Sequence, residues 1–107
     1  MEMNETDYKI AKELKRRLSS EFNLIDFKVF GSRALGIGAD DSDMDVYVQV
    51  ETINSDTKKK IFEIAWEVGF NNSVVITTLI FSRFEVLDSP LRESPIIKNI
   101  HMHGVSV

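Results

Sequence analysis

A short segment of the chain combines residue types that hold phosphate and metal ions. Gly31-Ser32 follows an apolar stretch, Gly36 comes soon after, and two aspartates one residue apart, Asp43 and Asp45, complete the set. Glycine lets the backbone approach a ligand closely. A serine hydroxyl and neighbouring backbone amides can hold phosphate oxygens, as anion-binding nests do. The segment therefore predicts a site for a polyphosphate.

The spacing of the two aspartates decides which way they point. Residues 43–50 predict a strand in which apolar and polar residues alternate. The apolar set is Met44, Val46, Val48 and Val50, and the other set is Asp43, Asp45, Tyr47 and Gln49. Because alternate side chains of a strand share a face, the aspartates point the same way, with their roots about 6–7 Å apart. Both carboxylates can then bind one Mg²⁺, which prefers oxygen ligands. A metal between carboxylates and phosphates is the arrangement of phosphoryl or nucleotidyl transfer.

Length and composition set the limits for the rest of the chain. The 107 residues predict a single domain, residues 1–107, and 43% hydrophobic with 28% charged residues is ordinary globular composition. A net charge of −4 argues against non-specific nucleic-acid binding and against adhesion to anionic membranes. No cysteine is present, which excludes disulfides and thiolate chemistry. Met1 begins a polar, acidic segment, and no apolar run approaches the ~20 residues of a membrane span. We expect a cytoplasmic protein.

Hydrophobic periodicity predicts the elements that position the segment. The first helix carries apolar residues every four positions, and it begins after a cap at Asn4 or Thr6. A second helix follows a cap at Ser55 or Asp56 and runs to about residue 68, with Gly69 as its stop. The apolar sets of the two helices are Ile10, Leu14, Leu18 and Phe22, and Ile61, Ile64, Ala65 and Val68. Phe62 and Trp66 lie beside the second set, where they widen the core contact or face a partner.

Strands and a last helix complete the pattern. Residues 24–30 and 74–81 predict strands, the second of them β-branched and buried on both faces. Ser94 with Pro95 predicts the start of a last helix, Gly104 its end, and residues 105–107 a short edge strand. The order helix, strand, glycine turn, strand, helix, strand, helix predicts an α/β (α+β) domain. Its small mixed sheet has three to four strands packed with helices.

The residues around the chemical segment resemble a known signature. Residues 29–36, VFGSRALG, followed by residues 42–46, SDMDV, resemble the motif of the polymerase-beta-like nucleotidyltransferase superfamily. More narrowly, the chain is similar to the minimal nucleotidyltransferases of bacteria and archaea, which are about this long. The motif fits neither the Walker A loop nor the G-x-G-x-x-G fingerprint.

The resemblance assigns roles to individual residues. It implies that Gly31 and Ser32 bind the nucleoside triphosphate, and that Asp43 and Asp45 are the catalytic residues that ligate Mg²⁺. Arg33 resembles the basic residue common after the glycine–serine pair, where it helps to neutralise phosphate charge.

The chain departs from the family pattern at one position. Active members carry a third carboxylate on the next core strand, which completes the metal site and helps to activate the acceptor hydroxyl. The corresponding segment here, residues 74–81, contains no Asp or Glu, and its polar residues are Thr77 and Thr78. Glu85 and Asp88 follow the strand and reach the site only if the chain bends back. General bases contribute about 10²–10⁴-fold to such reactions, so the substitution bears directly on catalysis.

Two functional hypotheses follow. The first is a Mg²⁺-dependent nucleotidyltransferase that transfers a nucleoside monophosphate, AMP from ATP, to a hydroxyl. By resemblance, its partner is a small helical HEPN-type protein, an RNase toxin for which this chain is the antitoxin. Because 107 residues leave little room for a domain that covers the base, a partner chain or a second copy of itself would complete the cleft. The alternative is a catalytically degenerate protein of the same fold that regulates a partner by contact alone.

Other polar residues predict less. His101 and His103 lie about 160° apart on a helix, so they cannot share a metal ion there, and a structural or solvent-facing role is favoured. Tyr47 either borders the site or packs in the core. Lys58, Lys59 and Lys60 predict a solvated helix face or a patch for a partner.

Overall fold

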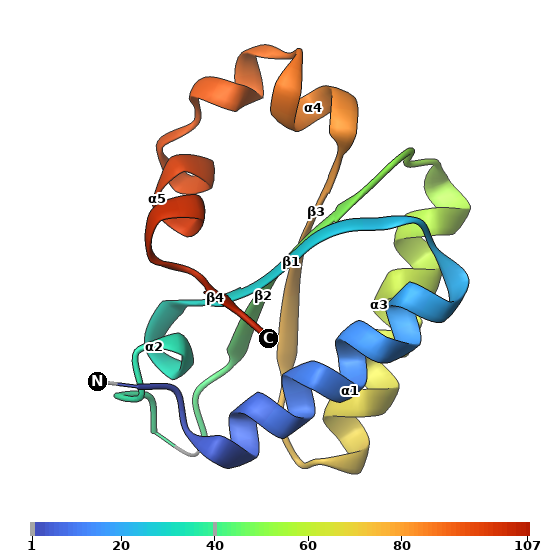
Figure 1. The fold of residues 1–107 in the computed structure, drawn as a ribbon. Helices are drawn as coiled ribbons and strands as arrows, with labels where there is room; N and C mark the ends of the chain where they lie inside the picture. Colours follow the sequence, from blue (N-terminus) through green and yellow to red (C-terminus); the bar gives the residue numbers. More distant parts are fainter. Residues whose placement is uncertain (1, 40) are drawn as a thin grey trace.

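The structure, a computed structural model, describes residues 2–39 and 41–107 of the chain. Over these residues it forms a mixed α+β domain, as the sequence predicts (Figure 1). The strand order in the sheet is β3-β2-β1-β4. The elements are α1 (Glu5–Glu21), β1 (Leu24–Phe30), α2 (Gly31–Ala34), β2 (Met44–Val50), α3 (Ser55–Asn71), β3 (Ile76–Ser82), α4 (Arg83–Leu87), the 3-10 helix η1 (Pro90–Glu93), α5 (Pro95–His103) and β4 (Val105–Ser106). Strand β1 is antiparallel to β2 and β4, and β2 is parallel to β3. Met1, and Asp40 of the predicted acidic turn, lie outside the described residues.

Helix α1 begins where an asparagine caps it. The Oδ1 atom of Asn4 accepts hydrogen bonds from the backbone amides of Thr6 and Asp7, at 2.7 and 3.4 Å. This decides between the two predicted caps, because the unpaired amides of a first turn need such an acceptor. Ile10, Leu14 and Leu18 of the predicted stripe are buried in the main core, as their four-residue spacing predicts. Phe22, the fourth member, is the C-cap of α1 and packs half-buried against this core.

Strand β2 contributes side chains to a hydrophobic cluster on each face of the sheet. Its apolar set, from Met44 to Val50, lies in the core with α1 and α3, which cover one face of the sheet (Figure 1). On the other face, Tyr47 and Gln49 are buried as well, and Tyr47 belongs to a second cluster with Val86, Ile97 and Ile100. The segment from α4 to α5 therefore covers the second half of β2 on this face. The start of β2 at Asp45 is only half-buried.

Two predictions for α3 are wrong. Its cap is Asn54, whose Oδ1 accepts from the amide of Thr57 at 2.8 Å, and neither Ser55 nor Asp56. The helix also passes Gly69 and ends at Asn71, and the chain reverses at Ser73 with φ of +57°. Gly69 is needed for another reason, since a Cβ there would overlap the carbonyl oxygen of Val74 as the chain returns towards β3.

The predicted burial of the third strand is also wrong. Strand β3 is an edge strand that pairs with β2 and with no further strand among the described residues. Most of its residues are therefore half-buried, and Thr77 is exposed. A β-branched run fits an edge that is half covered as well as it fits a central strand, so composition alone did not distinguish the two.

The last part of the chain is partly as predicted. Helix α5 starts at Pro95, although the Ser94 side chain makes no capping hydrogen bond, and it ends at Gly104. Strand β4 pairs with β1 at Lys28 and Val29, which confirms the predicted edge strand. The sequence did not predict α4 and η1. Across residues 2–39 and 41–107, no helix is long and apolar enough to cross a membrane.

Candidate functional site

The end of β1 and the start of β2 meet at Gly31. Phe30 is the register partner of Asp45, so the next residue lies beside the Asp45 side chain. Gly31 has φ of +76°, which favours glycine, and a Cβ at this position would overlap Oδ2 of Asp45. The glycine therefore allows both the turn into α2 and the close approach of the carboxylate.

The two aspartates lie at the same end of the sheet, with a threonine beside them. Asp45 is the register partner of Thr77 on β3, and parallel partners present their side chains on one face. Asp43 is exposed just before β2, and its Oδ2 accepts a long hydrogen bond, 3.4 Å, from Oγ1 of Thr77. Asp43, Asp45 and Thr77 thus form one polar cluster at the start of β2 and β3.

The electrostatics of this cluster suit a cation. Burial raises the pKa of Asp45, and the negative charge of Asp43 raises it further. A divalent cation would relieve that repulsion, and Mg²⁺ is usually held by one or two carboxylates together with substrate phosphates. No group of three His, Cys, Asp or Glu side chains within the described ranges is placed to hold a metal ion. The two aspartates therefore fit Mg²⁺ that shares its remaining positions with a nucleotide or water.

Ser32 lies in α2, and its side chain is next to Gly38 of the loop that follows α2. An added Cβ at Gly38 would come within 2.9 Å of the Ser32 Oγ and 2.7 Å of the Ser42 Oγ. The Ser42 hydroxyl donates to the carbonyl of Ala39 at 2.7 Å, which holds the loop. Two hydroxyls therefore converge on Gly38, a residue to which the sequence gave no specific role. Phosphate binding by Gly31 and Ser32 stays a prediction.

Arg33 makes contacts within the protein. It is 8% exposed, its Nη1 forms an ion pair with Oδ1 of Asp7 at 2.7 Å, and its Nε donates to the carbonyl of Ser42 at 2.9 Å. The guanidinium thus joins the first turn of α1, the helix α2 and the residue that precedes Asp43. These contacts favour a positioning role, and phosphate binding by Arg33 stays a prediction.

Sequence reasoning missed Asp7, although a signal was present. Asp7 is 8% exposed, and it precedes Ala11, Leu14 and Leu18 of the buried stripe by four, seven and eleven residues. An acidic residue in register with an apolar stripe needs a buried partner. Arg33 is that partner.

On β3, the strand on which the family pattern places a third carboxylate, Thr77 stands opposite Asp45. Glu85 does not replace it, because its side chain closes a capping box, accepting from the Ser82 amide at 3.0 Å. Ser82 lies five residues beyond Thr77 on β3, a distance of about 16 Å. Thr78 points to the other face, towards α3, and its Oγ1 is buried without a hydrogen-bond partner among the described residues.

The other polar candidates lie away from the cluster. Tyr47 is fully buried, so it packs in the core. Its burial raises the pKa of the phenol, and the negative charge of Asp26 raises it further by a smaller amount. Its ring meets the ring of His101 edge-on at 5.4 Å between centroids, and Nε2 of His101 lies 3.9 Å from Oδ2 of Asp26. His103 is exposed at the end of α5.

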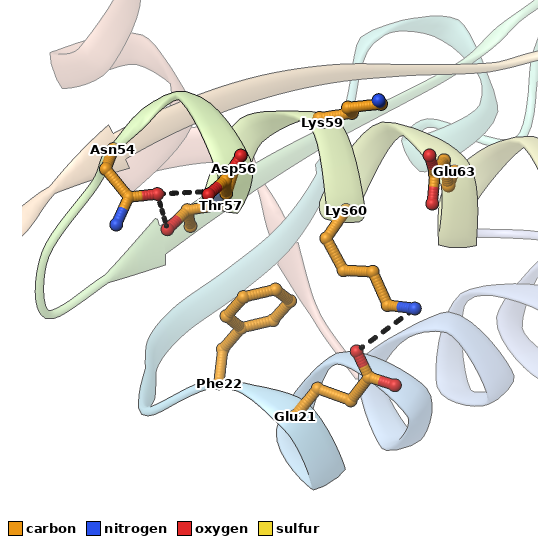
Figure 2. Close-up of a pocket in the computed structure, with 8 residues that line it drawn as sticks. All are labelled: Glu21, Phe22, Asn54, Asp56, Thr57, Lys59, Lys60 and Glu63. Carbon is orange, nitrogen blue, oxygen red and sulfur yellow. Dashed lines mark hydrogen bonds and ion pairs between the residues drawn. The ribbon is translucent and has the colours of Figure 1, made fainter.

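A pocket of about 510 Å³ lies at the opposite end of β2 (Figure 2). It is formed by the end of α1 and the start of α3, and Lys60 pairs there with Glu21 at 3.8 Å. Helix α3 begins after Val50, which is about 17 Å along β2 from Asp45. The lysines near the start of α3 therefore do not belong to the aspartate cluster.

Comparison with known proteins identifies the family. The family model "Poly(A) RNA polymerase, mitochondrial-like, central palm domain" matches residues 1–102. The chain belongs to this family. Its structure is also similar to that of a proposed nucleotidyltransferase from Sulfolobus solfataricus, with a TM-score of 0.52 and 27% identity, covering 72% of this chain and 68% of the other. No curated protein sequence matches the chain. These matches confirm a polymerase-beta-like nucleotidyltransferase domain.

We predict that Asp7→Ala destabilises the domain by about 3 kcal/mol, because it breaks the buried ion pair between Asp7 and Arg33. Chemical denaturation followed by circular dichroism measures the change. Glu5→Ala is the control, since it removes the exposed pair with Lys9 from the same turn of α1 and should have a much smaller effect. Equal losses in the two variants would contradict the role of the Asp7–Arg33 pair.

We predict that Asp45→Asn stabilises the metal-free protein at pH 7. The folded-state pKa of Asp45 is raised, so its contribution to stability is fully present below the ordinary value of 3.8 and is lost as pH rises through the folded value. The variant has no carboxylate to ionise, so its advantage should be largest at pH 7 and should disappear near pH 3.8. Urea unfolding in EDTA at several pH values measures this. A difference that stays constant with pH would refute the prediction.

Proposed function

We propose that this domain is a Mg²⁺-dependent nucleotidyltransferase. It would transfer a nucleoside monophosphate, AMP from ATP, to a hydroxyl group and release pyrophosphate. One observation carries the proposal: Gly31, Asp43 and Asp45 lie together at one end of the sheet. The chain also belongs to a nucleotidyltransferase family. We expect the reaction to take place in the cytoplasm.

The residues of the cluster divide the work. Asp43 and Asp45 would hold Mg²⁺, which would supply charge neutralisation at the phosphates when bound. The Gly31 backbone and the Ser32 hydroxyl would hold and orient phosphate oxygens. In the reaction the acceptor oxygen forms a bond to the α-phosphorus. The bond between that phosphorus and the oxygen bridging the α- and β-phosphates breaks, and pyrophosphate leaves. Positioning and electrostatic stabilisation account for most of the catalysis in such transfers.

A second candidate function rests on Thr77. The acceptor hydroxyl must lose a proton, and the threonine opposite Asp45 is a poor base. A domain with this residue could bind Mg²⁺ and a nucleotide, and regulate a partner by contact without transfer. The resemblance to minimal nucleotidyltransferases suggests that partner: a small helical HEPN-type toxin, which would be the acceptor in the first function and the bound target in the second.

The first test is transfer of label from α-³²P-ATP. We predict that wild-type protein with Mg²⁺ and a co-expressed partner transfers label, and that Asp43→Asn reduces the rate at least about 100-fold. Asp41→Asn is the matched control, because Asp41 is an exposed acidic residue of the same segment to which the proposal gives no role. The thermal shift with Mg-ATP, measured in parallel, reports binding.

The outcomes separate the two functions. A thermal shift that Asp43→Asn abolishes, without any transfer by the wild type, would support the contact regulator and reject the transferase. Neither transfer nor a thermal shift would reject both functions.

The second test restores the missing carboxylate. We predict that Thr77→Asp increases the transfer rate by about 10²–10⁴-fold, since the new carboxylate would lie opposite Asp45 and beside Asp43. Thr77→Asn has nearly the same shape without the charge, and it should give no increase. An unchanged rate in Thr77→Asp would mean that the absent base does not limit the reaction.

A further inference from the structure

Helix α3 exposes a row of aromatic side chains. Phe62, Trp66 and Phe70 recur every four residues and are 59%, 66% and 70% exposed, and the rings of Trp66 and Phe70 stack at 5.1 Å. Val75, just before β3, is 65% exposed. A groove of about 580 Å³ runs between this row and residues 73–76. We call these four side chains the α3–β3 surface. An exposed apolar patch of this kind marks an interaction site.

The edge of β3 adjoins this surface and is open to pairing. Natural edge strands usually carry charged residues, proline or a bulge that prevents association. Strand β3, Ile76–Ser82, contains neither a charged residue nor proline, and it follows β2 in unbroken register over its whole length. Residues 68–82 carry no charged side chain, although 28% of the chain is charged. Two copies that meet at this edge would therefore bring no charged side chains of residues 68–82 together, although each copy has a net charge of −4.

The geometry suits a second copy of the same edge. Helix α3 connects the parallel strands β2 and β3, so it lies over them on the face that α1 shares. If β3 pairs antiparallel with β3 of a second copy across a two-fold axis, the strands lie about 4.8 Å apart. Both α3 helices then lie on the same face, antiparallel, at about the 8–10 Å at which helices pack. Their aromatic rows face each other across the axis.

The area is also sufficient. Aromatic side chains bury about 150–250 Å² each, so the α3–β3 surface exposes roughly 450 Å² per copy at the fractions above. Two copies would bury roughly 900 Å² before the strand edges are counted, and specific interfaces start near 1,000 Å². A two-fold dimer uses the same surface patch on both subunits, so the patch must be complementary to itself. The α3–β3 surface with the adjoining β3 edge can serve as such a patch.

We propose that the chain forms a two-fold dimer in which β3 pairs antiparallel with β3 of a second copy, and the aromatic rows of the two α3 helices pack over the junction. The dimer joins two sheets into one continuous sheet. It also brings the second copy next to Thr77, the register partner of Asp45. The proposal is independent of the proposed activity, because it rests on the α3–β3 surface and the edge of β3 alone.

Sedimentation velocity tests the dimer. Wild-type protein should sediment as a dimer at micromolar concentrations, and Trp66→Glu should weaken association at least about 100-fold. Met102→Glu is the matched control, since Met102 is a 75% exposed apolar residue of α5, and it should leave the dimer intact. Because Trp66 is 66% exposed, the circular dichroism spectrum of Trp66→Glu should match that of the wild type.

Hydrogen exchange tests the strand pairing itself. Backbone amides of β3 that face away from β2 should be protected in the wild type and should exchange much faster in Trp66→Glu, while β1 amides stay unchanged. A monomeric wild type at 100 µM would overturn the proposal and leave the surface for a different protein. A dimer that Trp66→Glu does not affect, or that leaves the β3 amides unprotected, would also overturn it.

Discussion

The contact between Gly31 and Asp45 is the constraint on which the site depends. The register of β1 and β2 places Phe30 opposite Asp45, so the chain must turn immediately beside a carboxylate. Only glycine meets both demands there, because the backbone has positive φ and a side chain would overlap the carboxylate oxygen. The glycine–serine motif and the aspartate motif are therefore two halves of one geometric arrangement.

The Asp7–Arg33 ion pair connects α1 to both parts of the site. Arg33 follows Ser32 directly, and its side chain holds the carbonyl of Ser42, which precedes Asp43. A shift of α1 would therefore displace the Arg33 guanidinium, and with it the positions of Ser32 and Asp43 on either side of the site. Buried ion pairs of this kind often serve to fix geometry rather than to increase net stability.

The sequence predicted the parts of the fold that depend on periodicity. The α1 stripe and the two faces of β2 follow from their periodicity, and the structure places the alternate residues of β2 in two different clusters. The start of α5 at Pro95 follows instead from the fixed φ of proline, which suits a first helical position. It was wrong where tertiary contact decides. Gly69 looks like a helix stop, yet it is there for the close approach of Val74. The edge position of β3 depends on the strand order, which β-branched composition does not encode.

The candidate site shows the same division. The shared face of Asp43 and Asp45 follows from the period of two along a strand. The pairing of Arg33 with Asp7, 26 residues away, could be seen only in the fold. The assignment of Arg33 to phosphate came from resemblance alone and stays a prediction, and the contacts of Arg33 include those with Asp7 and Ser42. The missing carboxylate was visible in the sequence, and the register adds that Thr77 stands directly opposite Asp45.

The capping box at Ser82 and Glu85 has a consequence for the direction from which a ligand arrives. It turns the chain into α4 directly at the end of β3, and the segment that follows then returns across Tyr47 towards β1. This segment covers the second half of β2 on this face, whereas Asp43 and Thr77, at the start of β2 and β3, are exposed. A long ligand whose reactive end binds at Asp43 and Asp45 would therefore extend away from the covered half of the sheet, past the start of β2.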